Sequence, residues 1–243
     1  MCTVSFVALD NGQYVITSNR DEHISRHTPV APVTATHNNL NITYPKDPKS
    51  GGTWFAVSEN GVIGVLLNGA FRKHRPKGNY EKSRGLVLLE ITSNTDPALF
   101  LKTADLTQIE PFTLILFSGS VLLEFRWDGN QKHFGELSTK RNYIWSSATL
   151  YSNQVMEQRS KLFEEFVTGP EAIDPANIIK FHSNTNEDQE NGFVMNRSNT
   201  LKTLSITQAV IDTEEIGLRH MDLLMHQQQS VAVALNTMFN QTQ

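Results

Sequence analysis

The segment Val62-Ile-Gly-Val-Leu-Leu-Asn68 is apolar on both of the faces that a β-strand would present. Successive side chains of a strand point to opposite sides of its sheet, so a strand of this kind must be covered on both sides. A Glu59-Asn60-Gly61 turn precedes it and joins it to a second β-rich segment, residues 54–57. The pattern predicts a hairpin whose second strand is central in its sheet.

Turn residues and helix caps place further elements along the chain. Asn11-Gly12 and Ser118-Gly119-Ser120 are expected to close two more hairpins, and Ser83 and Asp96 are expected to cap helices. The hairpins would cover residues 3–18 and 112–127, with further strands at 144–147, 200–207, 208–213 and 217–224. The helices are expected at 83–92, at 96–104, from 152 or 153 to about 167, and at 175–181.

The remaining segments are polar or contain several prolines. Residues 28–53 are expected to form a loop-rich excursion and residues 182–192 a mobile surface loop, while residues 230–239 suit a strand or a helix. Strands and helices follow one another in groups, without regular β-α-β alternation. This order predicts an α+β fold in which helices cover antiparallel sheets. The length of 243 residues predicts a single domain, residues 1–243.

Composition narrows the function class. A net charge of −4 gives no electrostatic footprint for a nucleic acid or an anionic membrane, so small-molecule or protein partners are expected. No stretch approaches the roughly 18 apolar residues of a membrane span, and no basic region followed by an apolar run opens the chain. A single cysteine cannot form an internal disulfide, which agrees with a reducing compartment. We therefore expect a cytoplasmic protein.

That single cysteine is residue 2. Methionine aminopeptidases remove Met1 when the second side chain is small, and the mature chain would then begin at Cys2. A free α-amine has a pKa of about 7.7–8.0 and a thiol about 8.5, so one residue could supply both a nucleophile and its base. The alternative is that Cys2 is a small buried hydrophobic residue, which is the usual role of a solitary cysteine.

The first predicted hairpin bears on this choice. Its turn at Asn11-Gly12 would return the chain so that the Asn19-Arg20-Asp21-Glu22 block lies at the end of the second strand. Cys2 and Asp21 should then be close in space although they are 19 residues apart. The alternative is that this block is a turn with a surface ion pair.

Several short motifs carry a family resemblance in the order in which they occur. They are Met1-Cys2-Thr3-Val4, Ser18-Asn19-Arg20-Asp21-Glu22, Ser25-Arg26, Gly51-Gly52-Thr53-Trp54 and Arg197-Ser198-Asn199-Thr200. Together they resemble the NRDE family, also called the transport and Golgi organisation 2 family. That family is similar to the N-terminal nucleophile hydrolases of the choloylglycine hydrolase and penicillin V acylase group. The resemblance implies an αββα sandwich, two antiparallel sheets between helical layers.

The resemblance also implies hydrolysis of a linear amide, with Cys2 as the nucleophile. In the acylase group an aspartate at the position of Asp21 holds the α-amine of the nucleophile. A nearby carboxylate favours the ammonium form of an amine, so the contribution of Asp21 would be to position the amine. Asn68 and Asn153 match asparagines that help to bind the oxyanion, and Arg197 matches a late arginine that could hold a carboxylate or orient Cys2.

Each of these residues has a plainer alternative role. Asn68 could simply begin the turn at Gly69, Asn153 could be an ordinary helix cap, and Arg197 could be a solvated arginine at a strand end. Arg20 departs from the acylase pattern, in which the arginine precedes the aspartate by three residues. It could stabilise a thiolate, bind substrate or brace Glu22. Trp54 could wall a substrate pocket or belong to the core.

No cofactor or metal is expected. His23 and His27 have i,i+4 spacing but lack the H-E-x-x-H motif of a zinc site, and Gly51-Gly52 is not followed by the Lys-Ser/Thr of a phosphate loop. The rival to an amidohydrolase is a non-catalytic binding or trafficking protein. It would handle a lipid or haem or serve secretory and Golgi organisation, as the family name suggests, although no haem attachment motif is present. A scaffold with an inert Cys2 is a third alternative.

Overall fold

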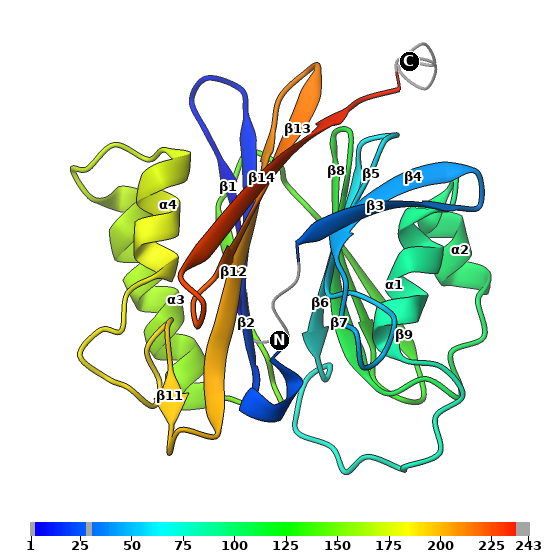
Figure 1. The fold of residues 1–243 in the computed structure, drawn as a ribbon, viewed down its shortest axis with the longest axis horizontal. Helices are drawn as coiled ribbons and strands as arrows, with labels where there is room; N and C mark the ends of the chain where they lie inside the picture. Colours follow the sequence, from blue (N-terminus) through cyan, green and yellow to red (C-terminus); the bar gives the residue numbers. More distant parts are fainter. Residues whose placement is uncertain (1–2, 28–30, 237–243) are drawn as a thin grey trace.

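Two antiparallel sheets lie face to face in the computed structural model, which describes residues 3–27 and 31–236 (Figure 1). Helices cover the outer face of each sheet, and the order of layers is α, β, β, α. The expected αββα sandwich is confirmed. No helix in the described ranges is long and apolar enough to cross a bilayer.

The first sheet has seven strands among the described residues, with β10, β1, β2, β12, β13 and β14 as successive neighbours and β11 beside β12. Its outer face is covered by α3 and α4 (Figure 1). The strands are β1 (Thr3–Ala8), β2 (Tyr14–His23), β10 (Tyr143–Ser146), β11 (Asn196–Arg197), β12 (Leu201–Ile211), β13 (Glu215–Asp222) and β14 (Gln227–Ala234). The helices are α3 (Asn153–Thr168) and α4 (Pro175–His182).

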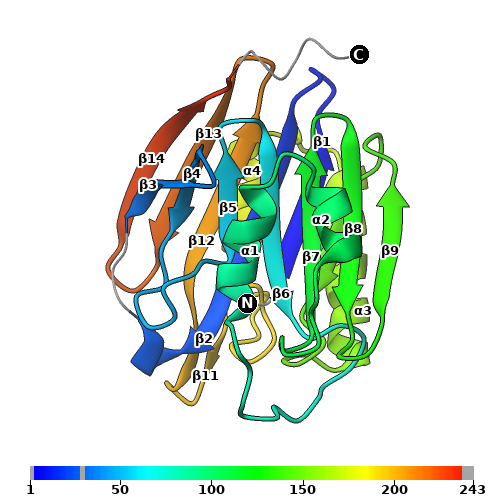
Figure 2. The same ribbon diagram turned by 90° about the vertical axis from the view of Figure 1, so that its right-hand side faces the viewer.

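The second sheet also has seven strands in the described part of the chain, and they follow one another in sequence order from β3 to β9. Figure 2 shows α1 and α2 on its outer face. The strands are β3 (Pro32–His37), β4 (Leu40–Pro45), β5 (Phe55–Ser58), β6 (Val62–Asn68), β7 (Phe112–Ser118), β8 (Val121–Trp127) and β9 (Lys132–Leu137). The helices are α1 (Arg84–Thr92) and α2 (Pro97–Thr103), and η1 (Ile24–Arg26) is a short 3₁₀ turn after β2.

The central position predicted for β6 is confirmed. It pairs with β5 on one side and with β7 on the other, and its side chains are buried from Val62 to Leu67. Helix α1 packs closely on it because Gly64 has no side chain. A Cβ atom added to Gly64 would lie 2.6 Å from Leu88 Cδ1. The main hydrophobic cluster joins α1 to residues of both sheets, including Phe6 and Phe117.

The predicted helix caps are also confirmed. The Ser83 and Asp96 side chains accept hydrogen bonds from the backbone N–H groups of Leu86 and Leu99. Ser152, rather than Asn153, caps α3, and its side chain accepts from Val155 N. Each oxygen satisfies one of the N–H groups that a helix start leaves without an intrahelical partner.

Three segments differ from the sequence-based expectation. Residues 32–45 form the β3–β4 hairpin rather than a loop, and its turn places Asn38 and Asn39 at positive φ, where asparagine is tolerated. The strands expected at 200–207 and 208–213 form one strand, β12. The ambiguous tail begins with the last residues of strand β14, which runs from Gln227 to Ala234, while residues 237–239 lie outside the described residues.

Strand β12 contains an irregularity beside the Asn19–Glu22 block. Thr203 pairs with Asp21 and Ser205 pairs with Arg20, so Leu204 is an extra residue between two paired positions. Directly paired residues face the same side of a sheet. This β-bulge therefore keeps Thr203 on the side of Asp21 and Ser205 on the side of Arg20.

Candidate active site

Strand β2 does not end before the Asn19–Glu22 block, as the sequence suggested, but runs through it to His23. Alternation along a strand sends neighbouring side chains to opposite faces. The Asn19 side chain donates to carbonyl oxygens at the end of α4 and in the following loop, whereas Arg20 stacks on Trp54 between the sheets. Arg20 and Asp21 thus point to opposite faces, the arrangement expected if the strand continued.

Asp21 is almost completely buried, and its carboxylate is held by two hydroxyl groups. Tyr151 Oη donates to Asp21 Oδ2 over 2.7 Å, and Thr203 Oγ1 donates to Oδ1 over 2.5 Å. Tyr151 comes from the segment before α3, and Thr203 comes from β12 next to the bulge. A carboxylate accepts about four hydrogen bonds, and these two hydroxyls supply two of them.

Two arginines lie over the ring of Tyr151. The guanidinium carbon of Arg159 lies 3.8 Å from the ring centre and that of Arg197 lies 5.4 Å from it. A cation over the face of an aromatic ring is attracted by the ring quadrupole. Arg159 also donates to Thr3 Oγ1 and to the carbonyl oxygens of Asn191 and Gly192. Two cationic groups therefore hold the ring that carries the hydroxyl group.

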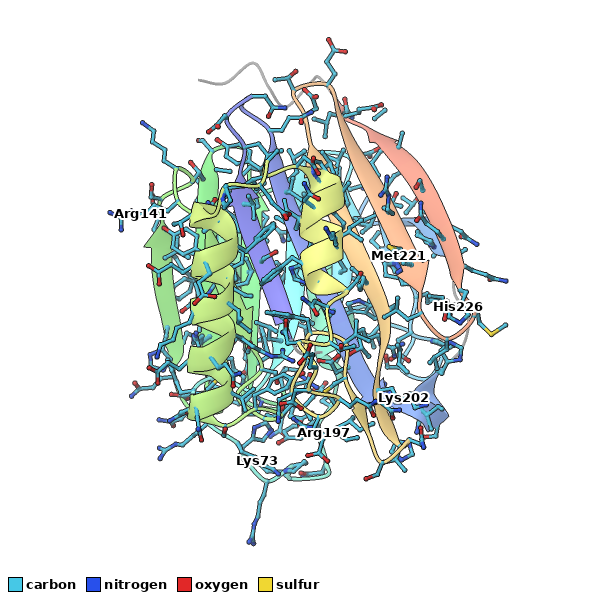
Figure 3. The ribbon with its side chains drawn as sticks, turned by 90° about the vertical axis from the view of Figure 1, so that its left-hand side faces the viewer. Lys73, Arg141, Arg197, Lys202, Met221 and His226 are labelled. Atoms are coloured by element: carbon cyan, nitrogen blue, oxygen red, sulfur yellow. The ribbon has the colours of Figure 1, made fainter. Side chains whose placement is uncertain are left out.

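Arg197 approaches Asp21 through Tyr151, over whose ring it lies. Its three guanidinium nitrogens donate to Glu190 O, Leu150 O and Asn191 Oδ1 over 2.8–3.1 Å. Figure 3 shows Arg197 at the lower end of the molecule, the end that also carries Lys73 of the loop after β6. In this arrangement Arg197 fastens the 183–195 segment to the segment before α3.

Arg20 belongs to a second cluster, between the sheets. Its Nη2 atom lies 2.9 Å from Asp47 Oδ2, and Arg26 Nη2 lies 2.9 Å from the same oxygen. Burial alone would raise the pKa of Asp47, but the two guanidinium groups outweigh burial and hold that pKa below its usual value. Trp54 is 3% exposed and lies under Arg20, so its position is that of a core residue.

A cleft of about 370 Å³ opens between β2, the end of β6 and the start of α1. Asn68, at the end of β6, is part of its wall, and the Asn68 carbonyl accepts a hydrogen bond from Ser147 Oγ. The lining includes Glu22, Arg26, Leu66, Tyr80, Arg84 and Glu110. Arg84 Nη2 lies 3.1 Å from Glu110 Oε2, so the cleft has a polar wall in which positive and negative groups alternate.

The remaining candidates lie apart from these clusters. Asn153 is exposed in the first turn of α3, and its side chain makes no hydrogen bond with a described residue. Cys2 lies outside the described residues. The described pairing of β1 with β2 begins at Thr3, opposite Asn19, two residues before Asp21.

A hydrogen-bonded Ser5–His182–Asn19 chain resembles a hydrolase triad in composition. Both Asn19 Nδ2 hydrogens go to carbonyl groups, so Asn19 Oδ1 must accept from His182 Nδ1. His182 Nε2 then accepts from Ser5 Oγ over 2.7 Å. All three residues are fully buried, and burial lowers the pKa of His182 to about 3, with Arg159 contributing. This chain joins α4 to the first sheet and has no access to substrate.

A second cavity, of about 220 Å³, lies at the opposite end of the sandwich. Hairpin turns surround it, and Tyr14, Phe117 and Ile211 contribute apolar walls. None of the sequence-predicted site residues lines it, so the cleft beside Asn68 remains the candidate for substrate binding.

Sequence reasoning did not single out Tyr151, Thr203, Arg159 or Asp47. Tyr151 and Thr203 lie 130 and 182 residues from Asp21, a separation at which no sequence periodicity operates. Asp47 follows Pro45 and Lys46 in a segment expected to be a loop. Only the arrangement of strands brings these residues to the Asn19–Glu22 block.

Solved structures with the same fold include N-terminal nucleophile hydrolases. Two variants of conjugated bile acid hydrolase from Clostridium perfringens match with TM-scores of 0.61 and 0.59 at 9% identity, covering 95% of this chain and 92% and 96% of theirs. The Caenorhabditis elegans orthologue of N-acylethanolamine-hydrolyzing acid amidase matches with a TM-score of 0.52 at 11% identity, covering 85% and 92% of the two chains. The fold is therefore that of an N-terminal nucleophile hydrolase.

Comparison of the sequence with family profiles shows the family to which the chain belongs. The profile of the transport and Golgi organisation 2 family matches residues 1–237, so the chain belongs to that family. No curated protein sequence matches it at a significant level.

Proposed function

We propose that this chain is a cysteine N-terminal nucleophile hydrolase that cleaves a linear amide, with Cys2 as the nucleophile after removal of Met1. The main support is the burial of Asp21, two residues beyond the first described β1–β2 pair, in a fold shared with amide hydrolases. A buried carboxylate held by hydroxyl donors is suited to fix an ammonium group near the start of β1.

The proposed reaction has two steps. Cys2 Sγ attacks the carbonyl carbon while the thiol proton passes to the α-amine, and the C–N bond then breaks as the leaving amine takes that proton. A thioester remains on Cys2. Water attacks this thioester with the α-amine as base, which releases the acid and restores the thiol.

The cleft beside Asn68 is the proposed substrate site. The Asn68 side chain is the proposed oxyanion donor, since it stands in the cleft wall at the end of a rigid central strand. Asn153 is proposed as a second donor from the start of α3. Charged groups in the wall, among them Glu22 and Arg84, favour a substrate with polar groups beside the scissile amide.

Arg20, Trp54 and Arg197 act on this site indirectly in the proposal. Arg20 and Trp54 support the wall formed by the 46–53 segment, and Arg197 supports Tyr151. Direct contact of these three residues with substrate is the alternative proposal. Core packing and backbone carbonyls already engage them.

Intact mass and acyl labelling test this function directly, because Cys2 is the only thiol in the chain. The native protein should lack Met1 and should be acylated by p-nitrophenyl acetate, with release of p-nitrophenolate. A Cys2→Ala protein should not be acylated in this way. A variant with one alanine inserted before Cys2 keeps the thiol but lacks its free α-amine, and it should react much more slowly.

N-acylethanolamines, conjugated bile acids and N-acyl amino acids form a first substrate panel, chosen partly from what the structural neighbours act on. Retention of Met1 in the native protein would refute the proposal, because the base would then be an amide nitrogen.

The second candidate is a binding or trafficking protein of the transport and Golgi organisation 2 type that carries a lipid or haem. The observation that favours it is the exposure of Asn153, which places one proposed oxyanion donor in solvent. A visible absorbance band or a co-purifying lipid, together with no turnover by a processed Cys2, would decide for this candidate. A cytoplasmic location is proposed for either function.

A further inference from the structure

An N-terminal cysteine that forms a thioester faces a competing reaction. Its own α-amine can attack the thioester carbonyl through a five-membered ring. The C–S bond then breaks, a C–N bond forms, and the amine proton passes to sulfur. The product is a stable amide on the α-amine, and the enzyme is inactivated. A cysteine N-terminal nucleophile hydrolase must therefore hold its amine away from its own acyl group.

We propose that Tyr151 and Thr203 are positioning residues that hold Asp21 so that the α-amine of Cys2 cannot take the acyl group from its own thioester. This inference rests on the proposed function. The α-amine is neutral in the thioester, because it then acts as the base, so its protection comes from orientation: N–H groups that donate to a carboxylate of fixed orientation set the direction of the nitrogen lone pair.

The geometry around Asp21 fixes the orientation of its carboxylate. Its two oxygens accept from two hydroxyls on different elements, Tyr151 before α3 and Thr203 on β12. Rotation of the carboxylate about its last bond would break both hydrogen bonds. In a site from which solvent is largely excluded, a group that loses such a bond pays a desolvation penalty, so the carboxylate keeps one orientation.

The two donors, Tyr151 and Thr203, are themselves fixed by further contacts. The guanidinium groups of Arg159 and Arg197 both lie over the Tyr151 ring, and the Tyr151 hydroxyl also lies 3.2 Å from Met195 Sδ. Thr203 Oγ1 accepts from Met195 N over 2.9 Å, which directs its hydrogen toward Asp21. The bulge at Leu204 is what places this hydroxyl on the face of Asp21.

Arg159 connects the start of β1 to the Tyr151 ring. Its guanidinium donates to Thr3 Oγ1, and Thr3 is the residue that follows Cys2. The same guanidinium stacks on Tyr151. One buried side chain therefore fixes both the start of β1 and the ring whose hydroxyl holds Asp21.

Hydroxylamine separates the two acyl adducts, because it cleaves a thioester and leaves an amide intact. Wild type treated with p-nitrophenyl acetate should give an adduct that hydroxylamine removes almost completely. In Tyr151→Phe and Thr203→Val the hydroxylamine-resistant adduct on residue 2 should rise about tenfold, the effect of about 1.4 kcal/mol. Intact mass and sequencing of the N-terminal peptide measure it.

Two variants control for folding and for the loss of a hydroxyl group. Thr203→Ser keeps a hydroxyl donor and should behave as wild type. Tyr44→Phe removes another buried tyrosine hydroxyl, which pairs with His37 in the second sheet, and should also behave as wild type. Circular dichroism checks that each variant folds. If Tyr151→Phe does not fold, the amounts of hydroxylamine-resistant adduct in Thr203→Val and Thr203→Ser test the proposal.

The outcomes distinguish the two proposals. If wild-type Cys2 is not acylated at all, the proposed function is wrong. If wild-type Cys2 is acylated and the resistant adduct is no larger in Thr203→Val than in Thr203→Ser, the role assigned to Tyr151 and Thr203 is wrong while the hydrolase remains.

Discussion

The guanidinium carbon of Arg20 lies 4.2 Å from the centre of the Trp54 ring, although Arg20 comes from β2 of one sheet and Trp54 from the residue before β5 of the other. The contact therefore bridges the two layers. Asp47 lies at the end of the same guanidinium and also accepts from the backbone N–H groups of Lys49 and Ser50. Arg20 and Asp47 together fasten the segment that leads to Gly51-Gly52.

Replacing Asp47 by asparagine should destabilise the protein by about 3 kcal/mol, because two guanidinium groups would lose a buried counter-charge. Urea unfolding at neutral pH measures this loss. Glu136→Gln, which removes an exposed carboxylate in β9, should change the stability by less than about 0.5 kcal/mol. If the two variants lose the same free energy of unfolding, the Arg20–Asp47–Arg26 group contributes no more to stability than an exposed surface charge does.

Stability should fall as the pH decreases from about 6.5 toward 4. Burial lowers the pKa of His220 to about 4, with Asp222 opposing and Arg20 adding to the shift. Between that value and the unfolded pKa of about 6.5 the unfolded chain binds more protons, so acid favours unfolding by up to about 1.4 kcal/mol per pH unit for each such histidine. Above about pH 6.5 this contribution is constant.

Urea unfolding at a series of pH values tests this dependence. His220→Gln should flatten the decline, whereas His226→Gln, at an exposed position, should leave it unchanged. His182, with a pKa lowered to about 3, should account for much of the decline that persists in His220→Gln. A wild-type stability that stays constant from pH 7 to 4 would contradict the assignment.

Gly52→Ala should destabilise the protein by about 1–3 kcal/mol through overpacking. A Cβ atom at Gly52 would lie 2.4 Å from the carbonyl carbon of Gly85, and backbone at the start of α1 cannot move aside cheaply. Gly135→Ala is the matched control, since its Cβ would make only ordinary contacts at 3.8 Å and beyond. Thermal unfolding compares the stability of the two variants. A larger loss of stability in Gly135→Ala than in Gly52→Ala would contradict the overpacking expected at Gly52.

Arg159→Lys should cost about 2–4 kcal/mol, because an ammonium group cannot reproduce the forked donation to several buried oxygens. Segment 183–192 should also become more sensitive to protease, since Arg159 holds the carbonyl groups of Asn191 and Gly192. Arg141→Lys, at an exposed position (Figure 3), should leave both properties unchanged. Unaltered proteolysis in Arg159→Lys would contradict this role.

Local chemistry made most of the fold predictable. Helix caps at Ser83 and Asp96 and the turns at Gly12, Gly61 and Gly119 act over a few residues and can be recognised in the sequence. The β3–β4 hairpin was missed because its prolines suggested a loop. Pro32 and Pro45 pair with each other at the open end of the hairpin, and β3 is an edge strand, where proline is tolerated.

The surroundings of the candidate site were less predictable. The motif around Asp21 is visible in the sequence, but whether its carboxylate is solvated or held by Tyr151 and Thr203 depends on strand pairing between distant segments. The same holds for the partner of Arg20, since Asp47 joins it from the opposite sheet.

The bulge at Leu204 decides which residue of β12 lies opposite Asp21. It makes β12 one residue longer than its partner between the positions paired with Asp21 and Arg20. If β12 instead paired regularly beyond Ser205, Leu204 would lie opposite Asp21 and Thr203 would lie opposite Glu22, so the Thr203 hydroxyl would face away from Asp21. Every side chain that contacts Asp21 would still be encoded, so an inventory of residue types would miss the defect. The register of a single strand therefore decides which side chains surround Asp21.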